Sequence, residues 1–146
     1  MRFLDNFSAG TRGATSAEYF LSQGYAVIFL HRIHSLRPFS RHYSHSLNPF
    51  LDLLTVSSDS EIRIRSAEVD KLRPVLEAHN RSQTEGTLLS VDFQTINEYL
   101  WLLKGVTGAM SPLGRRGMFY LAAAVSDFFL PEDRTVCTLP PLSNEI

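Results

Sequence analysis

Two apolar runs on either side of a capped helical segment constrain the fold of this chain more than any other feature. Residues 87–91 (Thr-Leu-Leu-Ser-Val) and 118–125 (Met-Phe-Tyr-Leu-Ala-Ala-Ala-Val) have the length and apolar character of strands in a buried sheet. Between them, Thr95 and Glu98 match a capping box at a helix start. Apolar residues then recur at helical spacing, at Ile96, Leu100, Leu103 and Val106. A strand, a helix and a strand within about forty residues predict a right-handed parallel crossover, and therefore an α/β fold.

The beginning of the chain predicts a loop, a helix and a strand. Residues 6–13 form a polar loop that contains glycine, and residues 14–23 carry apolar side chains at helical spacing. Gly24 suits the end of this helix. Residues 25–30 are continuously apolar, which is typical of a strand buried on both faces.

The middle and the end of the chain show less periodicity. Residues 31–60 are rich in arginine, histidine and serine and contain two prolines, so we expect a structureless surface segment or flap. A helix is predicted from near Pro74, which a first turn tolerates, to a point before Gly86. Residues 131–146 lack periodicity and are interpreted as a tail.

Composition excludes several functional classes. The chain is 44% hydrophobic and 20% charged with a formal net charge of −1, which fits a globular domain without a field that attracts nucleic acid or an anionic membrane. The longest apolar run, residues 118–125, is too short to span a bilayer, and the first residues do not form a signal peptide. With Cys137 as the single cysteine, we expect a reducing, cytosolic compartment.

The loop at residues 6–13 is a candidate phosphate site. Parallel sheets bind ligands at the carboxyl ends of their strands, where loops lead into helices. Gly10 and Gly13 allow close backbone approach, and the free amides of the following helix favour an anion. Hydroxyl donors and a positive charge are also present, at Ser8, Thr11 and Arg12. The glycine spacing matches neither a dinucleotide fingerprint nor a P-loop, so an ordinary helix-entry turn is the alternative.

A second candidate follows the last apolar run. Ser126 and Asp127 come directly after small alanines, which leave room for a ligand beside the sheet edge. A helix cap or a simple turn is the alternative.

The histidine pairs do not predict a metal site. His31 and His34, like His42 and His45, are three residues apart, but no acidic or cysteine ligand accompanies them. No nucleophile-elbow sequence supports a serine hydrolase either.

The two candidate segments together carry a resemblance to a known family. Residues 2–14, RFLDNFSAGTRGA, closely resemble the RFLDNFSSGxRGA stretch of eukaryotic phosphopantothenate–cysteine ligases. Residues 119–128, FYLAAAVSDF, resemble the strand and turn FYLAAAVSDF of the same family. The likeness extends over residues 2–131 and is weakest in the middle.

This resemblance implies a fold, a reaction and a set of partners. The fold would be a Rossmann-like, mostly parallel sheet with flanking helices, and the assembly a homodimer. The reaction of coenzyme A biosynthesis would join cysteine to 4′-phosphopantothenate through an acyl-adenylate, with ATP as co-substrate and Mg²⁺ assisting. ATP is not distinguished from CTP by these motifs.

The resemblance also implies residue roles. Asn6 would be the catalytic residue, binding the pantothenate moiety and steadying the acyl-adenylate. The nucleotide phosphates would be lined by Ser8, Gly10 and Gly13. Phosphopantothenate would contact Ala123, Ala124 and Asp127, and Arg2 would reach the substrate held by the neighbouring subunit.

The chain also departs from the family pattern. Residues 1–130 are interpreted as a partial ligase domain and residues 131–146 as a divergent tail. The family's first strand and its lysine-bearing strap have no counterpart in this sequence, so we expect this chain to be impaired or inactive as a ligase. Two alternatives are a non-catalytic nucleotide- or phosphate-binding module and a structural fragment that pairs with a full-length subunit.

Overall fold

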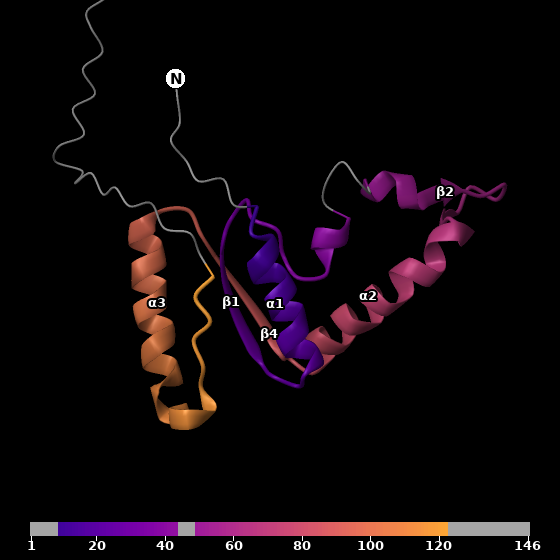
Figure 1. Cartoon of the computed structure of the whole chain (residues 1–146). Coiled ribbons are helices and arrows are strands. Elements are labelled where there is room, and N and C mark those ends of the chain that lie inside the picture. Colours follow the sequence, from indigo (N-terminus) through magenta and orange to yellow (C-terminus); the bar gives the residue numbers. More distant parts are fainter. Residues whose placement is uncertain (1–8, 44–48, 123–146) are drawn as a thin grey trace, which may run out of the picture. The chain divides into compact units, whose positions relative to one another are not determined.

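A computed structural model describes residues 9–43 and 49–122 of the chain. These residues form four strands and three longer helices, most of which are labelled in Figure 1. In chain order these elements are α1 (Thr11–Ser22), β1 (Val27–Arg32), β2 (Leu54–Val56), β3 (Ile62–Ile64), α2 (Ser66–Thr84), β4 (Leu88–Phe93) and α3 (Ile96–Met110). Short 3₁₀ helices cover Ser40–His42, Phe50–Leu53 and Ser111–Arg116.

Strands β1 and β4 form a parallel pair, which confirms the α/β class. Val27 lies opposite Leu88, and the register continues to Arg32 opposite Phe93. The connection from β1 to β4 contains α2, as a parallel connection requires. One further main-chain hydrogen bond follows the last residue of β1: the Ile33 N–H donates to the Phe93 carbonyl at 3.0 Å.

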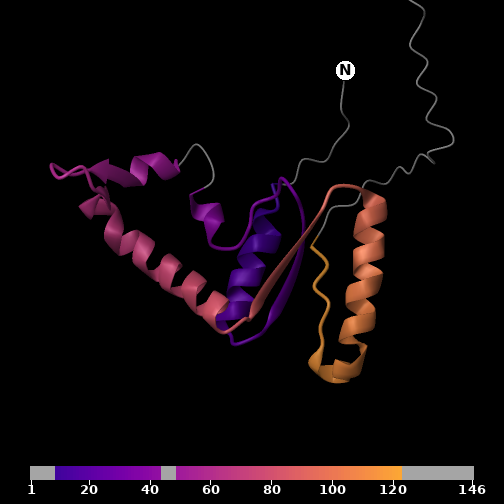
Figure 2. The same cartoon turned by 180° about the vertical axis from the view of Figure 1, so that it is seen from behind.

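Helix α1 lies beside this strand pair in both views of the molecule (Figures 1 and 2). It buries Ala14 and Ala17, whose small side chains let a helix approach a sheet closely. Gly24 adopts a φ of 83° just after the helix, so the predicted stop is confirmed. The prediction that strand 25–30 is buried on both faces was wrong: Tyr25 and Ile28 are exposed, because β1 belongs to a two-stranded sheet among the described residues.

Helix α2 is longer than predicted. It begins at Ser66, eight residues before Pro74, which lies inside the helix. Pro74 has no N–H to donate to the carbonyl four residues earlier, so the helix tolerates one missing bond there. The prediction placed the start near Pro74 because proline is tolerated in the first turn of a helix.

The segment at residues 31–60 is not structureless, contrary to the prediction. It contains two 3₁₀ turns and the strand β2, which pairs antiparallel with β3. The connecting turn is closed by the Ser60 N–H, which donates to the Ser57 carbonyl at 3.0 Å. Each strand has three residues, which is too short for an alternating pattern to be recognised in a sequence.

The predicted strand at residues 118–125 is not formed where the structure describes it. Residues 118–122 have no strand conformation, and Met118, Phe119 and Leu121 are exposed. A strand needs a neighbour for its main-chain groups, and the β1–β4 sheet holds no third strand among the described residues. The crossover predicted within residues 87–125 is therefore wrong over this part, although its helix and its first strand are confirmed.

Residues 9–43 and 49–122 contain no candidate membrane-spanning helix. None of the helices there combines the length and the apolar character needed to cross a bilayer.

Candidate functional site

The beginning of α1 is shaped by a glycine in a left-handed conformation. Gly10 is the N-cap residue, with φ of 80° and ψ of 10°, and its carbonyl accepts a bond of 3.0 Å from the Ala14 N–H. The first turn carries no acidic residue. Among the described residues, no side chain is bonded to the N–H groups of residues 11–13. Such a helix start attracts an anion, because its amides and the helix dipole present positive charge.

The loop that follows β1 packs against this helix start. The Leu36 N–H donates to the Ala9 carbonyl at 2.8 Å. A β-carbon added to Gly10 would lie 2.8 Å from the β-carbon of Ser35, which is closer than real β-carbons approach. Two independent reasons therefore favour glycine at position 10: its positive φ, and the close approach of the loop that contains Ser35.

Three donors converge on one carbonyl and hold this loop in place. The Arg32 carbonyl accepts from the Ser35 N–H at 2.9 Å and from the Ser35 hydroxyl at 2.8 Å. The Nδ1 atom of His31 lies 2.9 Å from the same oxygen. His31 is buried and stacks on Phe29, with ring centroids 5.1 Å apart. These contacts place Ser35 against Gly10.

The helix start and the ends of the parallel strands therefore lie at one edge of the sheet. Loop residue Leu36 bonds to Ala9, and Ile33 bonds to the end of β4 at Phe93. In open α/β sheets this carboxyl edge is where ligands bind. The sequence prediction for Gly10 and Gly13, the two described members of the predicted nucleotide site, is compatible with this placement but is not tested by it.

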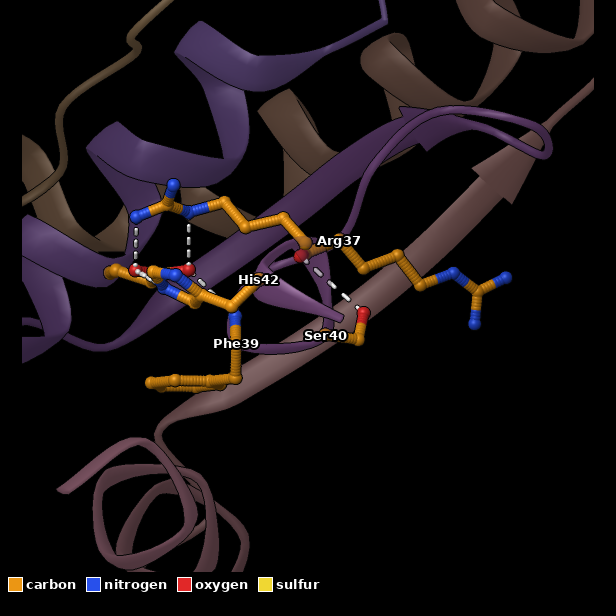
Figure 3. Close-up of polar contacts among 6 residues, drawn as sticks. Arg37, Phe39, Ser40 and His42 are labelled. Carbon is orange, nitrogen blue, oxygen red and sulfur yellow. Dashed lines mark hydrogen bonds and ion pairs between the residues drawn. The ribbon is translucent and has the colours of Figure 1, made fainter. Parts of the chain in front are cut away.

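The carboxylate of Glu18, in the middle of α1, binds residues 39–42. The two oxygens of Glu18 accept from Arg41, with Nε to Oε1 at 2.7 Å and the terminal nitrogen to Oε2 at 2.8 Å. The Phe39 N–H donates to Oε1 at 2.7 Å, and His42 Nε2 lies 3.3 Å from Oε2 (Figure 3). A bidentate arginine and a backbone amide make this a strong, directed contact.

These contacts lower the pKa of Glu18. Burial acts to raise the pKa, but the hydrogen bonds from Arg41 and from the Phe39 N–H, together with the charge of Arg41, outweigh it. The carboxylate is therefore ionised in the folded protein, and it anchors residues 39–42 to α1.

Phe39 is held in a strained turn by this anchor. Its φ of 66° and ψ of −53°, with the Ser40 N–H donating to the Pro38 carbonyl at 2.8 Å, define the rarer, strained kind of γ-turn. The buried Phe39 ring meets the His79 ring edge-on, with centroids 5.7 Å apart. The sequence did not point to this cluster, because Glu18 and Arg41 are separated by 23 positions and neither belongs to a motif.

The histidines that the structure describes do not form a candidate metal site. Among the described residues, no group of three or more histidine, cysteine, aspartate or glutamate residues could hold an ion. His31 contacts a carbonyl and Phe29, and His42 contacts Glu18. His45 lies outside the described residues.

Most of the predicted site residues lie outside the described residues. These are Arg2, Asn6, Ser8, Ala123, Ala124 and Asp127. Their roles stay predictions. The start of the second motif does contact α1: the Ser16 hydroxyl donates to the Tyr120 hydroxyl at 3.3 Å, and the rings of Phe20 and Tyr120 meet edge-on at 5.4 Å.

Fold and sheet-edge geometry together define an α/β protein with a parallel strand pair and flanking helices. No family model matches the chain. The chain is 47% identical over 131 residues to "Phosphopantothenate–cysteine ligase 2" of Oryza sativa and 48% identical over 136 residues to "Phosphopantothenate–cysteine ligase CAB2" of Saccharomyces cerevisiae. These matches cover 90% and 92% of this chain, but 40% and 36% of the relatives. The phosphopantothenate–cysteine ligase of Homo sapiens is 44% identical over 138 residues.

The chain is also similar in structure to a solved member of the same group of proteins. A Cab2 variant in complex with phosphopantothenate-cysteine superposes with a TM-score of 0.78 at 46% identity, covering 92% of this chain and 42% of that one. The chain is therefore a relative of the phosphopantothenate–cysteine ligases, and it spans about two fifths of the length of the relatives that it matches.

Proposed function

We propose that the start of α1 binds the phosphate groups of ATP, as part of a ligase that joins cysteine to 4′-phosphopantothenate. One observation carries this proposal: α1 begins at a left-handed glycine, without a capping side chain or an acidic residue, at the carboxyl edge of a parallel strand pair. The names of the relatives support the reaction, and the solved structure with phosphopantothenate-cysteine supports the substrate class.

The proposed reaction has two steps. A carboxylate oxygen of 4′-phosphopantothenate attacks the α-phosphorus of ATP, and pyrophosphate leaves to give an acyl-adenylate. The amine of cysteine then attacks the acyl carbon, AMP leaves, and an amide bond forms. Both steps bring anionic groups together, so positioned amides and cations contribute more than a nucleophilic side chain.

The proposed roles of individual residues follow the family resemblance. Ser8, Gly10 and Gly13 line the nucleotide phosphates, and Asn6 steadies the acyl-adenylate. Ala123, Ala124 and Asp127 contact phosphopantothenate, and Arg2 reaches the substrate of the partner in a homodimer. The proposed roles of Gly10 and Gly13 are supported by their places at the N-cap and in the first turn of α1.

Residues 9–43 and 49–122 contain no group of three or more histidine, cysteine, aspartate or glutamate residues that could hold Mg²⁺. In the proposed reaction it would be bound chiefly by the phosphates of ATP.

A pair of glycine-to-alanine substitutions tests the phosphate site. Gly13→Ala places a β-carbon 3.6 Å from Phe29, an ordinary contact, so the fold tolerates it. Because our proposal assigns this position to the phosphate site, we expect ATP to bind at least about tenfold more weakly to Gly13→Ala by titration calorimetry. Gly105→Ala in α3 is the matched control, because its β-carbon meets nothing within 4 Å. Equal ATP affinity for the two variants would exclude this helix start as the phosphate site.

A non-catalytic nucleotide-binding module is the second candidate, because a helix start of this kind favours an anion whether or not a reaction follows. Asn6→Ala separates the two functions. A ligase loses pyrophosphate release in the presence of ATP, cysteine and 4′-phosphopantothenate while it keeps nucleotide binding. A module releases no pyrophosphate before or after the substitution.

A further inference from the structure

Residues 36–39 form a short tether that is bound to α1 at both ends. At the first end, the Leu36 N–H donates to the Ala9 carbonyl at 2.8 Å, just before the helix begins. At the last end, the Phe39 N–H donates to Oε1 of Glu18 at 2.7 Å (Figure 3). Both donors belong to the main chain, so the two contacts fix the path of the backbone between them.

The tether has little slack between these two contacts. From Gly10 to Glu18 the helix rises about 12 Å, at about 1.5 Å per residue. The stretch from Leu36 to Phe39 spans at most about 11 Å when it is fully extended. Pro38 lies within this stretch and is buried, and its ring restricts both its own main chain and that of the residue before it. A displacement at the Glu18 contact should therefore reach Leu36 rather than be absorbed on the way.

The Glu18 contact also imposes the conformation of the last tether residue. Arg41 binds both oxygens of the Glu18 carboxylate, whose side chain is 17% exposed. Phe39 has a φ of 66°, which a residue with a side chain keeps only where its surroundings impose it. Without the Glu18 contact, Phe39 can relax and the end of the tether can move.

The first end of the tether lies at the phosphate site proposed above. Ser35 precedes the tether, and a β-carbon added to Gly10 would lie 2.8 Å from the β-carbon of Ser35. Ala9, which accepts from Leu36, lies between Gly10 and Ser8 in the sequence, and both neighbours are assigned to the nucleotide phosphates. The position of this loop therefore affects how closely a phosphate can approach the helix start.

From these contacts we propose that Glu18 is a positioning residue for nucleotide binding. Its carboxylate lies about two turns from the helix start, so it acts through the tether rather than by touching a phosphate. The tether holds Ser35 and Leu36 against the start of α1 and so fixes the surroundings of the bound anion. The inference rests on the proposed function, because it deepens the phosphate site assigned there.

Electrostatics and positioning predict opposite effects on ATP affinity. Replacing Glu18 with a neutral residue removes a negative charge about 12 Å from the helix start, and this change alone favours an anion slightly. Release of the tether instead removes preorganised surroundings, and this change weakens binding. Weaker ATP binding by a neutral variant can therefore be assigned to the tether.

The experiment compares the parent chain with Glu18→Gln and Glu18→Ala by titration calorimetry with ATP. Glutamine keeps an oxygen that can accept from the Phe39 N–H, whereas alanine keeps neither contact and remains a strong helix former. We expect the dissociation constant to rise about threefold for Glu18→Gln and at least about tenfold for Glu18→Ala. Thr95→Ala is the matched control, because it removes a capping bond from a different helix and should leave ATP affinity unchanged.

The measurement is made where unfolding curves show every variant to be folded. Partial unfolding raises the apparent dissociation constant by the inverse of the folded fraction, so a folded variant that is merely less stable binds ATP as the parent does. A parent chain that binds no ATP overturns the proposed function and this inference with it. If the parent binds ATP and Glu18→Ala binds it equally well or more tightly, the positioning role alone is overturned.

Amide hydrogen exchange tests the tether if Glu18→Ala does not fold. In Glu18→Gln, the Leu36 N–H should exchange at least about fivefold faster than in the parent chain, relative to the Ala14 N–H. The Ala14 N–H is a suitable reference, because it donates to the Gly10 carbonyl within the first turn of α1. Equal acceleration of the two amides would report a general loss of stability and would contradict the tether.

Discussion

Two helices begin at the same edge of the parallel strand pair, and their first turns are built in opposite ways. In α3, the Thr95 hydroxyl accepts from the Glu98 N–H at 3.2 Å, and Glu98 Oε2 accepts from the N–H groups of Thr95 and Gln94 at 3.1 and 2.7 Å. In α1, the N-cap residue is Gly10, and no acidic residue occupies the first turn. The start of α3 satisfies its own amides, whereas at the start of α1 no side chain of residues 9–43 and 49–122 caps them.

The difference shows which helix start suits a ligand. The backbone bonds from Gln94 and Thr95 lower the pKa of Glu98, so the start of α3 already carries its own anion. A phosphate would be repelled there and attracted to α1. Both helices pack on the same sheet, so the contrast comes from local residues rather than from position in the fold.

The largest expected loss of stability comes from replacing Gly10, the left-handed glycine at the start of α1. Gly10→Ala combines a positive φ with a clash against Ser35, and we expect it to lower the free energy of unfolding by about 3 kcal/mol. Gly24→Ala shares the positive φ but meets nothing within 4 Å, so it should cost about 1 kcal/mol. Urea unfolding of both variants measures the difference. Equal costs would show that the loop after β1 does not require glycine at position 10.

A smaller loss of stability is expected when Glu18 of the same helix, which holds residues 39–42, is replaced. Glu18→Gln keeps the shape but removes the charge that Arg41 pairs with, which should cost about 2 kcal/mol at neutral pH. The pKa of Glu18 is lowered on folding, so its stabilisation is present above the ordinary value of 4.5 and is lost as pH falls through the folded pKa.

The pH dependence provides the control for this anchor. Unfolding free energies measured from neutral to acidic pH should fall more steeply for the parent chain than for Glu18→Gln. Parallel curves would show that the contacts of Glu18 with Arg41 and Phe39 do not stabilise the fold.

The smallest effect is expected at the cap of α3. Thr95→Ala removes one capping bond and should lower the free energy of unfolding by about 1 kcal/mol. Because this helix start is assigned no ligand, ATP affinity should remain that of the parent chain. A loss of ATP binding in Thr95→Ala, measured by calorimetry, would move the phosphate site from α1 toward α3.

Local signals predicted several elements well. The capping box of Thr95 and Glu98, the glycine stop at Gly24 and the strand that became β4 each depend on a few neighbouring residues. Such features form wherever those residues occur, because their hydrogen bonds and φ angles are set within one turn. The start of α1 was predicted less well, because residues 11–13 were assigned to the loop but belong to the helix, which begins at Thr11.

Features that depend on a distant partner were missed. The apolar run at residues 118–122 has strand-like composition, but no neighbouring strand accepts its main-chain bonds among the described residues. Glu18 reaches Arg41 and Phe39 across more than twenty positions, and the start of α2 lies well before the proline taken as its signal.

By itself, the sequence determined the α/β class, the helix boundaries at Gly24 and Thr95, and the relation to the phosphopantothenate–cysteine ligases, since each rests on residues close together in the chain. The tertiary structure alone decided that Gly10 lies against Ser35 and that Glu18 holds a strained turn at Phe39. The physical reason is that packing and pairing join groups far apart in sequence, and their free energy depends on which neighbour is present rather than on the residue type.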